Sequence, residues 1–204
     1  MRDPDNIASL AGLKPDLLGF IFYPGSKRYV LDKIKNLHSL NIASDIERVG
    51  VFVNEKYDQI LEYTQHFGIT TVQLHGVESR EECLKLKQAG YKVIKAILIG
   101  EESDLQQCNG YSEVADIFLF DTKSEQYGGT GKKFDWSVLQ SYNLQVPFLI
   151  SGGISANDIP DLSNFVHPYF LGVDINSKFE VEPGLKDVEK VKEFIREFNA
   201  TMFK

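Results

Sequence analysis

The sequence predicts an α/β fold, a TIM-type (βα)8 barrel of parallel strands. Short apolar runs alternate with amphipathic stretches along the whole chain, which predicts parallel strands joined by helical crossovers. Each unit spans roughly 25 residues, a length that suits an eight-fold barrel. Candidate site residues follow many different strands instead of one switch point, which favours the barrel over its rival, a doubly wound open sheet.

Seven apolar runs predict the strands. The runs are rich in β-branched, aromatic or leucine residues and are bounded by turn residues, a pattern typical of buried parallel strands. In chain order they cover residues 17–22, 49–53, 71–75, 93–97, 117–120, 147–151 and 170–174.

Helices are predicted between the strands. Residues 78–89 carry apolar or small side chains at helical spacing, with Ser79 and Glu82 as a capping box and Gly90 as the helix stop. Residues 186–198 carry a second apolar stripe of helical period. No linker or low-complexity segment divides the chain, so we expect one domain.

The chain begins with a helix, in which Asp3 is the cap and Pro4 the first helical residue. An eight-fold barrel needs one more strand before that helix. We therefore expect a single domain over residues 1–204 that is N-terminally truncated, lacks the first barrel strand and leaves two sheet edges unpaired.

Composition restricts the possible partners. Of 204 residues, 43% are hydrophobic and 25% charged, and no apolar stretch is long enough to span a bilayer. The net charge of −7 argues against nucleic acid or an anionic membrane as partner, but not against a small anionic substrate. The N-terminus does not resemble a signal peptide, so we expect a cytoplasmic protein. A monomer or a homodimer is expected. Cys83, Cys108 and the histidines show no metal-ligand spacing, so we expect no metal and two free thiols.

Asp121 ends the apolar run 117–120, and a glycine-rich segment follows at residues 125–132. Barrel enzymes hold their chemistry at the carboxyl ends of the strands, where a carboxyl group can protonate a substrate. The alternative is a helix cap or a turn residue. Asp121 is the candidate catalytic acid because other candidate site residues are expected on the same rim.

Two glycine-containing turns suggest a phosphate site. Gly152 and Gly153 follow the sixth predicted strand, and Asn176 and Ser177 come shortly after the seventh. Glycines let the backbone approach a ligand, and exposed N–H groups at such turns bind anions. If one strand is missing upstream, these turns follow barrel strands seven and eight, a common place for a phosphate. Each alone is equally consistent with an ordinary strand-to-helix turn.

Three basic residues remain open to two interpretations each. Arg28 follows the first run, and its guanidinium can pair with a carboxylate or remain a solvated loop side chain. His75 ends the third run and either hydrogen-bonds a substrate or has a structural role. Lys95 lies inside a strand and requires a carboxylate partner if it points into the barrel, which favours a structural ion pair over a catalytic role.

Six segments, in the correct order and over essentially the whole chain, match one known family. They are GFIFYPGSKRYV (19–30), RVGVFVNE (48–55), VQLHG (72–76), FDTKSEQYGGTGKKFDW (120–136), ISGGI (150–154) and GVDINSKFE (172–180). In these segments the chain resembles phosphoribosylanthranilate isomerase, an enzyme of tryptophan biosynthesis.

The resemblance implies a cofactor-free Amadori rearrangement of N-(5-phosphoribosyl)anthranilate to the 1-deoxyribulose 5-phosphate derivative. Asp121 would be the general acid that protonates the ribose ring oxygen. Arg28 would hold the anthranilate carboxylate, His75 would line the pocket, and Asp174 would contact the sugar. The residues implied around the phosphate are Gly152, Gly153, Asn176 and Ser177.

The resemblance also implies a general base that this chain lacks. The family opens with a strand ending in Cys–Gly, directly before the segment that matches Met1, and that cysteine is the base. Cys83 and Cys108 lie elsewhere and are not expected to replace it. We therefore expect this chain to be poorly active or inactive, and the natural protein to extend upstream through a Cys–Gly strand.

Smaller departures and alternatives remain. Asn176 and Lys178 stand where family members often carry Ser and Gly; Asn176 keeps its backbone N–H for the phosphate. Indole-glycerol-phosphate synthase, a related phosphate-binding barrel, uses lysines at early strand ends, and residues 49–54 offer none. A non-catalytic barrel that binds a sugar phosphate is the alternative from a different class.

Overall fold

The computed structural model describes residues 1–35, 37, 40, 42–123 and 133–202. Seven strands form one parallel sheet whose order follows the sequence. They are β1 (Leu17–Ile21), β2 (Glu47–Phe52), β3 (Thr71–Leu74), β4 (Lys92–Ile99), β5 (Ile117–Thr122), β6 (Phe148–Ile150) and β7 (Phe170–Val173).

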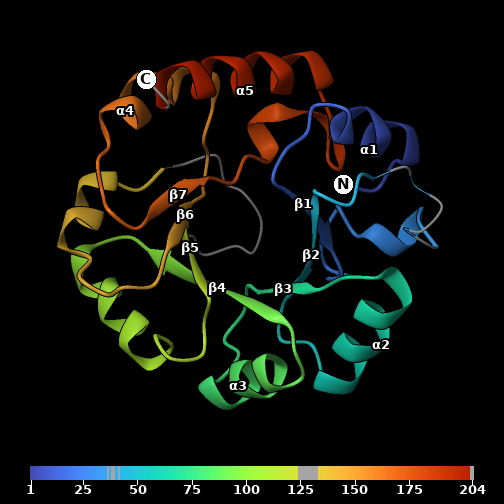
Figure 1. Cartoon of the computed structure of the whole chain (residues 1–204), viewed down its shortest axis with the longest axis horizontal. Coiled ribbons are helices and arrows are strands. Elements are labelled where there is room, and N and C mark those ends of the chain that lie inside the picture. The colour runs from blue at the N-terminus through green and yellow to red at the C-terminus, as the bar shows by residue number, and fades with distance from the viewer. Residues whose placement is uncertain (36, 38–39, 41, 124–132, 203–204) are drawn as a thin grey trace.

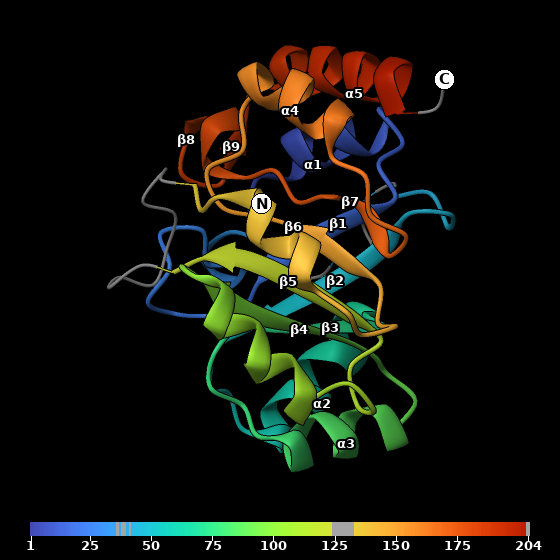
Figure 2. The same cartoon turned by 90° about the vertical axis from the view of Figure 1, so that its left-hand side faces the viewer.

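The sheet curls into a ring with the helices on its outside (Figure 1). Each strand pairs with the next one in the sequence, whereas a doubly wound sheet would reverse direction at a switch point. The predicted barrel class and all seven predicted strands are thus confirmed. Turned by 90°, the ring lies between a layer holding α1, α4 and α5 and a layer holding α2 and α3 (Figure 2).

The ring has an opening between its first and last strands. Among the described residues, β1 pairs with β2 and β7 pairs with β6, and no strand joins β7 to β1. The amino group of Met1, which is buried, donates a hydrogen bond to the Gly19 carbonyl oxygen of β1 at 3.3 Å. The expectation of seven strands with two unpaired edges matches this arrangement.

The predicted helix caps are confirmed. Asp3 accepts a hydrogen bond from the backbone N–H of Asn6, and the Ser79–Glu82 capping box is formed in both directions. Gly90, with φ of 90°, ends α3 as predicted. The α-helices are α1 (Pro4–Ala11), α2 (Tyr57–Phe67), α3 (Arg80–Gln88), α4 (Ile159–Asn164) and α5 (Val188–Met202).

Several crossovers use 3₁₀ helices, and one connection contains a hairpin that the sequence did not predict. The antiparallel strands β8 (Glu180–Glu182) and β9 (Leu185–Lys186) turn at Gly184, whose φ is 88°. The last helix therefore begins at Val188, two residues later than predicted. The 3₁₀ helices are η1 (Val30–Asp32), η2 (Glu102–Gly110), η3 (Trp136–Ser141), η4 (Ala156–Asp158) and η5 (Ser177–Phe179).

Alternation along the strands divides the apolar side chains between two cores. Successive strand residues point to opposite faces, so one set packs against the helices and the other fills the ring. The large aromatic side chains, such as Phe118 and Phe120, belong to the outer core. The smaller inner cluster comprises Val49, Ile94, Ala96, Ile117 and Leu119.

Lys95 alternates with Ile94 and Ala96, so its side chain points into the helix layer and not into the ring. Its Nζ lies 3.0 Å from the Glu78 carboxylate and 2.7 Å from the Gly76 carbonyl oxygen, with both charged side chains only 2% exposed. The predicted structural ion pair is confirmed.

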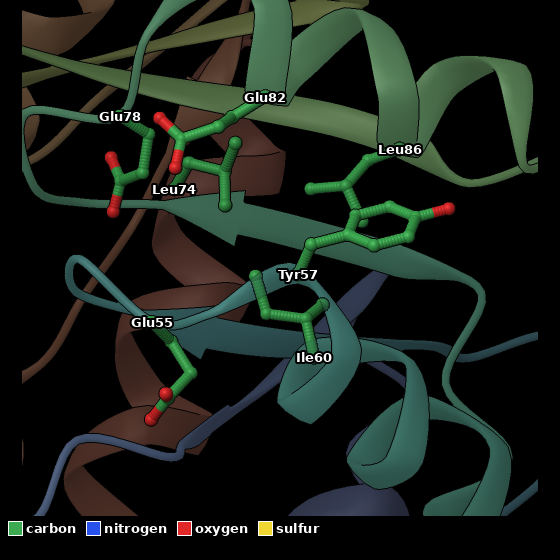
Figure 3. Close-up of a pocket in the computed structure, with 7 residues that line it drawn as sticks. All are labelled: Glu55, Tyr57, Ile60, Leu74, Glu78, Glu82 and Leu86. Carbon is green, nitrogen blue, oxygen red and sulfur yellow. The ribbon is translucent and has the colours of Figure 1, made fainter.

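The pocket drawn in Figure 3 lies in the same helix layer, between α2 and α3. Its free volume of about 10 Å³ is the space of a single water molecule. The pocket is therefore a packing gap and not a metabolite site. Its lining residues are Glu55, Tyr57, Ile60, Leu74, Glu78, Glu82 and Leu86.

Removing the carboxylate of Glu78 should destabilise the fold strongly. We expect Glu78→Ala to lower the free energy of unfolding by about 3–5 kcal/mol, because the substitution leaves the buried Lys95 ammonium without its counter-charge. Urea denaturation of the variant measures the change. Glu189→Ala is the control, because its pair with Lys192 is exposed and should contribute less than about 1 kcal/mol. Equal effects of the two substitutions would contradict the prediction.

Candidate active site

Asp121 lies at the carboxyl end of β5, two residues after Leu119 and on the same inward face. Its Oδ1 accepts a hydrogen bond from the backbone N–H of Thr122 at 2.8 Å, and its Oδ2 lies 3.0 Å from His75 Nε2. Both side chains are about a quarter exposed, at 22% for His75 and 24% for Asp121. The structure thus brings two predicted site residues together at the mouth of the ring.

Gln73 extends this pair into a chain of three side chains. Its Nε2 lies 2.9 Å from His75 Nδ1, and Gln73 and His75 share the inward face of β3. If the Gln73 amide donates to Nδ1, His75 carries its proton on Nε2 and donates it to the Asp121 carboxylate. Sequence analysis missed Gln73, although its spacing of two residues from His75 was a usable signal.

Gly152 brings the backbone against Asp121. Its φ is 92°, and a Cβ atom at this position would lie 2.7 Å from Asp121 Oδ1, closer than any side chain tolerates. Gly153 also has a positive φ, of 70°. Only glycine combines this conformation with this close approach. The predicted anion-binding turn and the predicted acid therefore occupy the same part of the rim.

Asp174 follows β7 and adds a second carboxyl group. Its backbone N–H donates to the Ile150 carbonyl oxygen at 2.8 Å, and its Oδ2 accepts a hydrogen bond from Ser151 Oγ at 3.2 Å. Burial raises the pKa of the Asp174 carboxyl, and the negative charge of Asp121 raises it further. Asp174 therefore retains its proton to a higher pH than an ordinary aspartate.

Arg28 is not a solvated loop side chain. Its Nε and Nη2 bond the Glu180 carboxylate at 2.9 Å and 2.6 Å, with the Arg28 side chain 15% and the Glu180 side chain 4% exposed. Sequence analysis missed Glu180, which lies 152 residues further along the chain. The arginine is thus already paired with a carboxylate of its own chain.

Asn176 and Ser177 follow β7, and η5 begins at Ser177. The Asn176 Oδ1 accepts a hydrogen bond from Lys186 Nζ at 2.5 Å. Lys178 is exposed, and its carbonyl oxygen accepts a hydrogen bond from Lys190 Nζ at 2.6 Å. The Asn176 side chain is thus engaged by a lysine of its own chain.

Neither cysteine belongs to this rim. Cys83 lies on α3 and Cys108 in η2, and both are buried in the outer core. Burial raises the pKa of the Cys83 thiol to about 11 and that of Cys108 to about 12. Both are therefore unreactive thiols near neutral pH.

Three further points concern the glycine-rich loop, metal sites and membrane-spanning helices. The predicted glycine-rich loop at 125–132 lies outside the described residues. Within the described ranges, no group of His, Cys, Asp or Glu is arranged to hold a metal ion. None of the helices in those ranges has the length and apolar character needed to cross a bilayer.

Comparison with known sequences finds the same family that the sequence motifs resemble. The profile of the N-(5'-phosphoribosyl)anthranilate isomerase family matches residues 2–197. The chain is 44% identical to the isomerase of Parabacteroides distasonis, over 97% of this chain and 90% of that protein. It is 45% identical to the isomerase of Phocaeicola vulgatus, over 97% of this chain and 94% of that protein.

Solved structures of the same family superimpose on this chain. The phosphoribosylanthranilate isomerase of Thermotoga maritima superimposes with a TM-score of 0.83 at 32% identity, covering 98% of this chain and 96% of that one. Monomers generated from the dimeric Thermotoga maritima enzyme give 0.78 at 32% identity, covering 96% and 93%. An isomerase in complex with reduced 1-(o-carboxyphenylamino)-1-deoxyribulose 5-phosphate gives 0.80 at 30% identity, covering 98% and 95%.

The carboxyl group of Asp174 should oppose folding at neutral pH. A carboxyl whose folded-state pKa is raised contributes stability at low pH that is lost as the pH rises through that pKa. We therefore expect Asp174→Asn to raise the free energy of unfolding at pH 7 by about 0.5–2 kcal/mol. The gain should shrink as the pH falls toward 3.8, the ordinary value.

Denaturant unfolding over a range of pH measures this effect. Asp161→Asn, at an exposed position of α4, is the control and should show little change at any pH. A loss of stability in Asp174→Asn at pH 7 would contradict the burial argument.

Proposed function

This chain belongs to the phosphoribosylanthranilate isomerase family of tryptophan biosynthesis, and we propose that Asp121 is the general acid of the isomerisation. The substrate would be N-(5-phosphoribosyl)anthranilate, rearranged to the 1-deoxyribulose 5-phosphate derivative. The observation that carries the proposal is the position of Asp121, which contacts His75 at 3.0 Å and lies against Gly152 at the mouth of the ring.

In the first step the protonated Asp121 would give its proton to the ribose ring oxygen. The bond between that oxygen and C1 breaks, the anthranilate nitrogen supplies the electron pair, and an iminium ion forms. Asp121 is then a carboxylate, and His75 with its proton on Nε2 stabilises that charge by a hydrogen bond. The Gln73 contact with Nδ1 supports this tautomer.

The phosphate would bind the backbone N–H groups after β6 and β7, at the four residues inferred from the resemblance. The positive φ of Gly152 and of Gly153 supports a turn that exposes backbone N–H groups in a conformation that other residues rarely adopt. The substrate's carboxylate would pair with Arg28, and Asp174 would contact the sugar. The reaction needs no metal or cofactor, because proton transfers account for every bond change. The proposed phosphate set is Gly152, Gly153, Asn176 and Ser177.

The second step requires a base to remove the C2 proton and form the enol-amine, which tautomerises to the ketone. In the family resemblance this base is a cysteine. Cys83 and Cys108 are buried away from the rim with raised pKa values, so neither is suited to the role. We therefore propose low turnover for the 204-residue polypeptide. The same observation favours a second candidate, a barrel that binds a sugar phosphate without turnover.

Supplying the base should separate the two candidates. We expect a chain extended at Met1 by a strand ending in Cys–Gly to isomerise the substrate about 10²–10⁴-fold faster than the 204-residue chain, the usual contribution of a positioned base. Fluorescence of the anthranilate group follows the reaction. The same extension ending in Ser–Gly is the control. Substrate binding without turnover in all three proteins would support the binding barrel instead.

In the extended chain, Asp121→Asn should reduce kcat by about 10²–10⁴-fold, because an amide cannot deliver the proton. The unfolding midpoint should remain near that of the parent. Asp161→Asn, at an exposed site, should leave kcat unchanged. Near-normal turnover in Asp121→Asn would remove this residue from the mechanism.

A further inference from the structure

A buried chain of charged and polar groups connects Arg28 with the turn after β7. The Glu180 carboxylate accepts hydrogen bonds from the Arg28 guanidinium, from the Gly184 backbone N–H at 3.1 Å and from Lys186 Nζ at 3.2 Å. Lys186 Nζ also donates to Asn176 Oδ1 at 2.5 Å. One ammonium group thus joins the partner of Arg28 to a residue of the proposed phosphate turn.

The pairing leaves part of the Arg28 guanidinium available. Glu180 bonds the side-on edge, formed by Nε and Nη2. A guanidinium carries five N–H donors, so the end-on edge of Nη1 and the second proton of Nη2 can receive another carboxylate. Glu180 therefore orients the guanidinium without consuming its capacity to bind an anion.

The charges of the cluster leave a positive surplus. Although burial raises the pKa of Glu180, the Arg28 hydrogen bond and the Lys186 charge keep it below its ordinary value. Burial lowers the pKa of Lys186, and the Glu180 charge opposes this change. With these three groups ionised, two cations surround one carboxylate. Asp174 also acts on Lys186, but burial raises the pKa of the Asp174 carboxyl and so favours its neutral form. Without Lys186, the Glu180 charge would cancel that of Arg28.

Two hydrogen bonds with the Asn6 side chain hold the backbone of Lys186 in place. The Asn6 side chain donates to the Lys186 carbonyl oxygen and accepts from its backbone N–H, both at 2.8 Å. The Lys186 side chain is 8% exposed, and it ends the hairpin whose turn is Gly184. The ammonium position is therefore set by both α1 and the hairpin.

We propose that Glu180 and Lys186 are positioning residues for the two anionic ends of the substrate. Glu180 aims the end-on edge of Arg28 at the substrate's carboxylate, and Lys186 maintains the positive surplus while it anchors Asn176 in the phosphate turn. This inference rests on the proposed function, because it takes the carboxylate site at Arg28 and the phosphate site at Asn176 as its starting point.

Equilibrium binding to the 204-residue chain tests the proposal without requiring turnover. The probes are reduced 1-(o-carboxyphenylamino)-1-deoxyribulose 5-phosphate and the same compound without its carboxyl group. Calorimetry gives Kd for the parent chain, Glu180→Gln and Arg28→Ala, with Glu189→Gln, from an exposed pair, as the control. We expect Glu180→Gln to weaken the carboxylate probe at least about tenfold and the other probe less than about twofold.

The outcomes separate this inference from the proposed function. If Arg28→Ala leaves the carboxylate probe unaffected, the carboxylate site itself is wrong. If Arg28→Ala weakens that probe and Glu180→Gln does not, the positioning role alone is overturned. If Glu180→Gln weakens the binding of both probes equally, Glu180 supports the hairpin and has no role in recognising the carboxylate.

Lys186 provides a second test, independent of whether Glu180→Gln folds. Lys186→Met removes the charge and should weaken both probes, because it affects both anion sites. Lys186→Arg keeps the charge and should retain binding within about threefold of the parent chain. Unchanged binding in a folded Lys186→Met protein, verified by thermal unfolding, would overturn the role of the ammonium group.

Discussion

The in-order parallel pairing of the strands brings the residues that follow each strand to one rim. Because each strand pairs with its sequence neighbour, all seven carboxyl ends reach one rim, and alternate residues point into the ring. Gln73 and His75 therefore share a face, as do Leu119 and Asp121. The 3.0 Å contact between His75 and Asp121, across 46 residues of sequence, is a consequence of this register.

Two cations among the described residues are held by buried glutamates in different ways. The ammonium of Lys95 contacts two carbonyl oxygens and the Glu78 carboxylate, which together use its three donors. The guanidinium of Arg28 is also held by a buried glutamate, but that pairing uses only two of its five donors, the Nε–H and one Nη2–H. The donors that remain on Arg28 are what the proposed carboxylate site would use, whereas Lys95 has none left.

Sequence reasoning recovered what depends on local pattern. The strands follow from apolar runs, the cap at Asp3 from the proline that follows it, and the cap at Ser79 from Glu82 three positions later. It did not recover Glu180 as the partner of Arg28, because no local pattern links residues 152 positions apart. The hairpin was missed for a different reason: its strands are too short to show a period, although Pro183 and Gly184 mark a turn.

The candidate site also combines features that the local sequence pattern predicted with features that depend on tertiary contacts. The identity of Asp121 and Gly152 as candidates came from their places after strands, whereas the reason that only glycine fits at 152 is a tertiary contact with the acid. Gln73 had a local signal, since it shares the parity of His75. That parity becomes informative only once the inward face of the strand is known.

A chain of net charge −7 binds an anionic substrate only where its local charge departs from the average. Two features of the rim produce that departure. The two cations around Glu180 leave one positive charge in surplus where the substrate's carboxylate would bind. Asp174 lies near the same cluster, since its charge acts on Lys186, and burial together with the Asp121 charge raises the pKa of its carboxyl group. Both effects reduce the repulsion that an anion would meet at this mouth, and partly buried charges are screened by salt less than exposed ones.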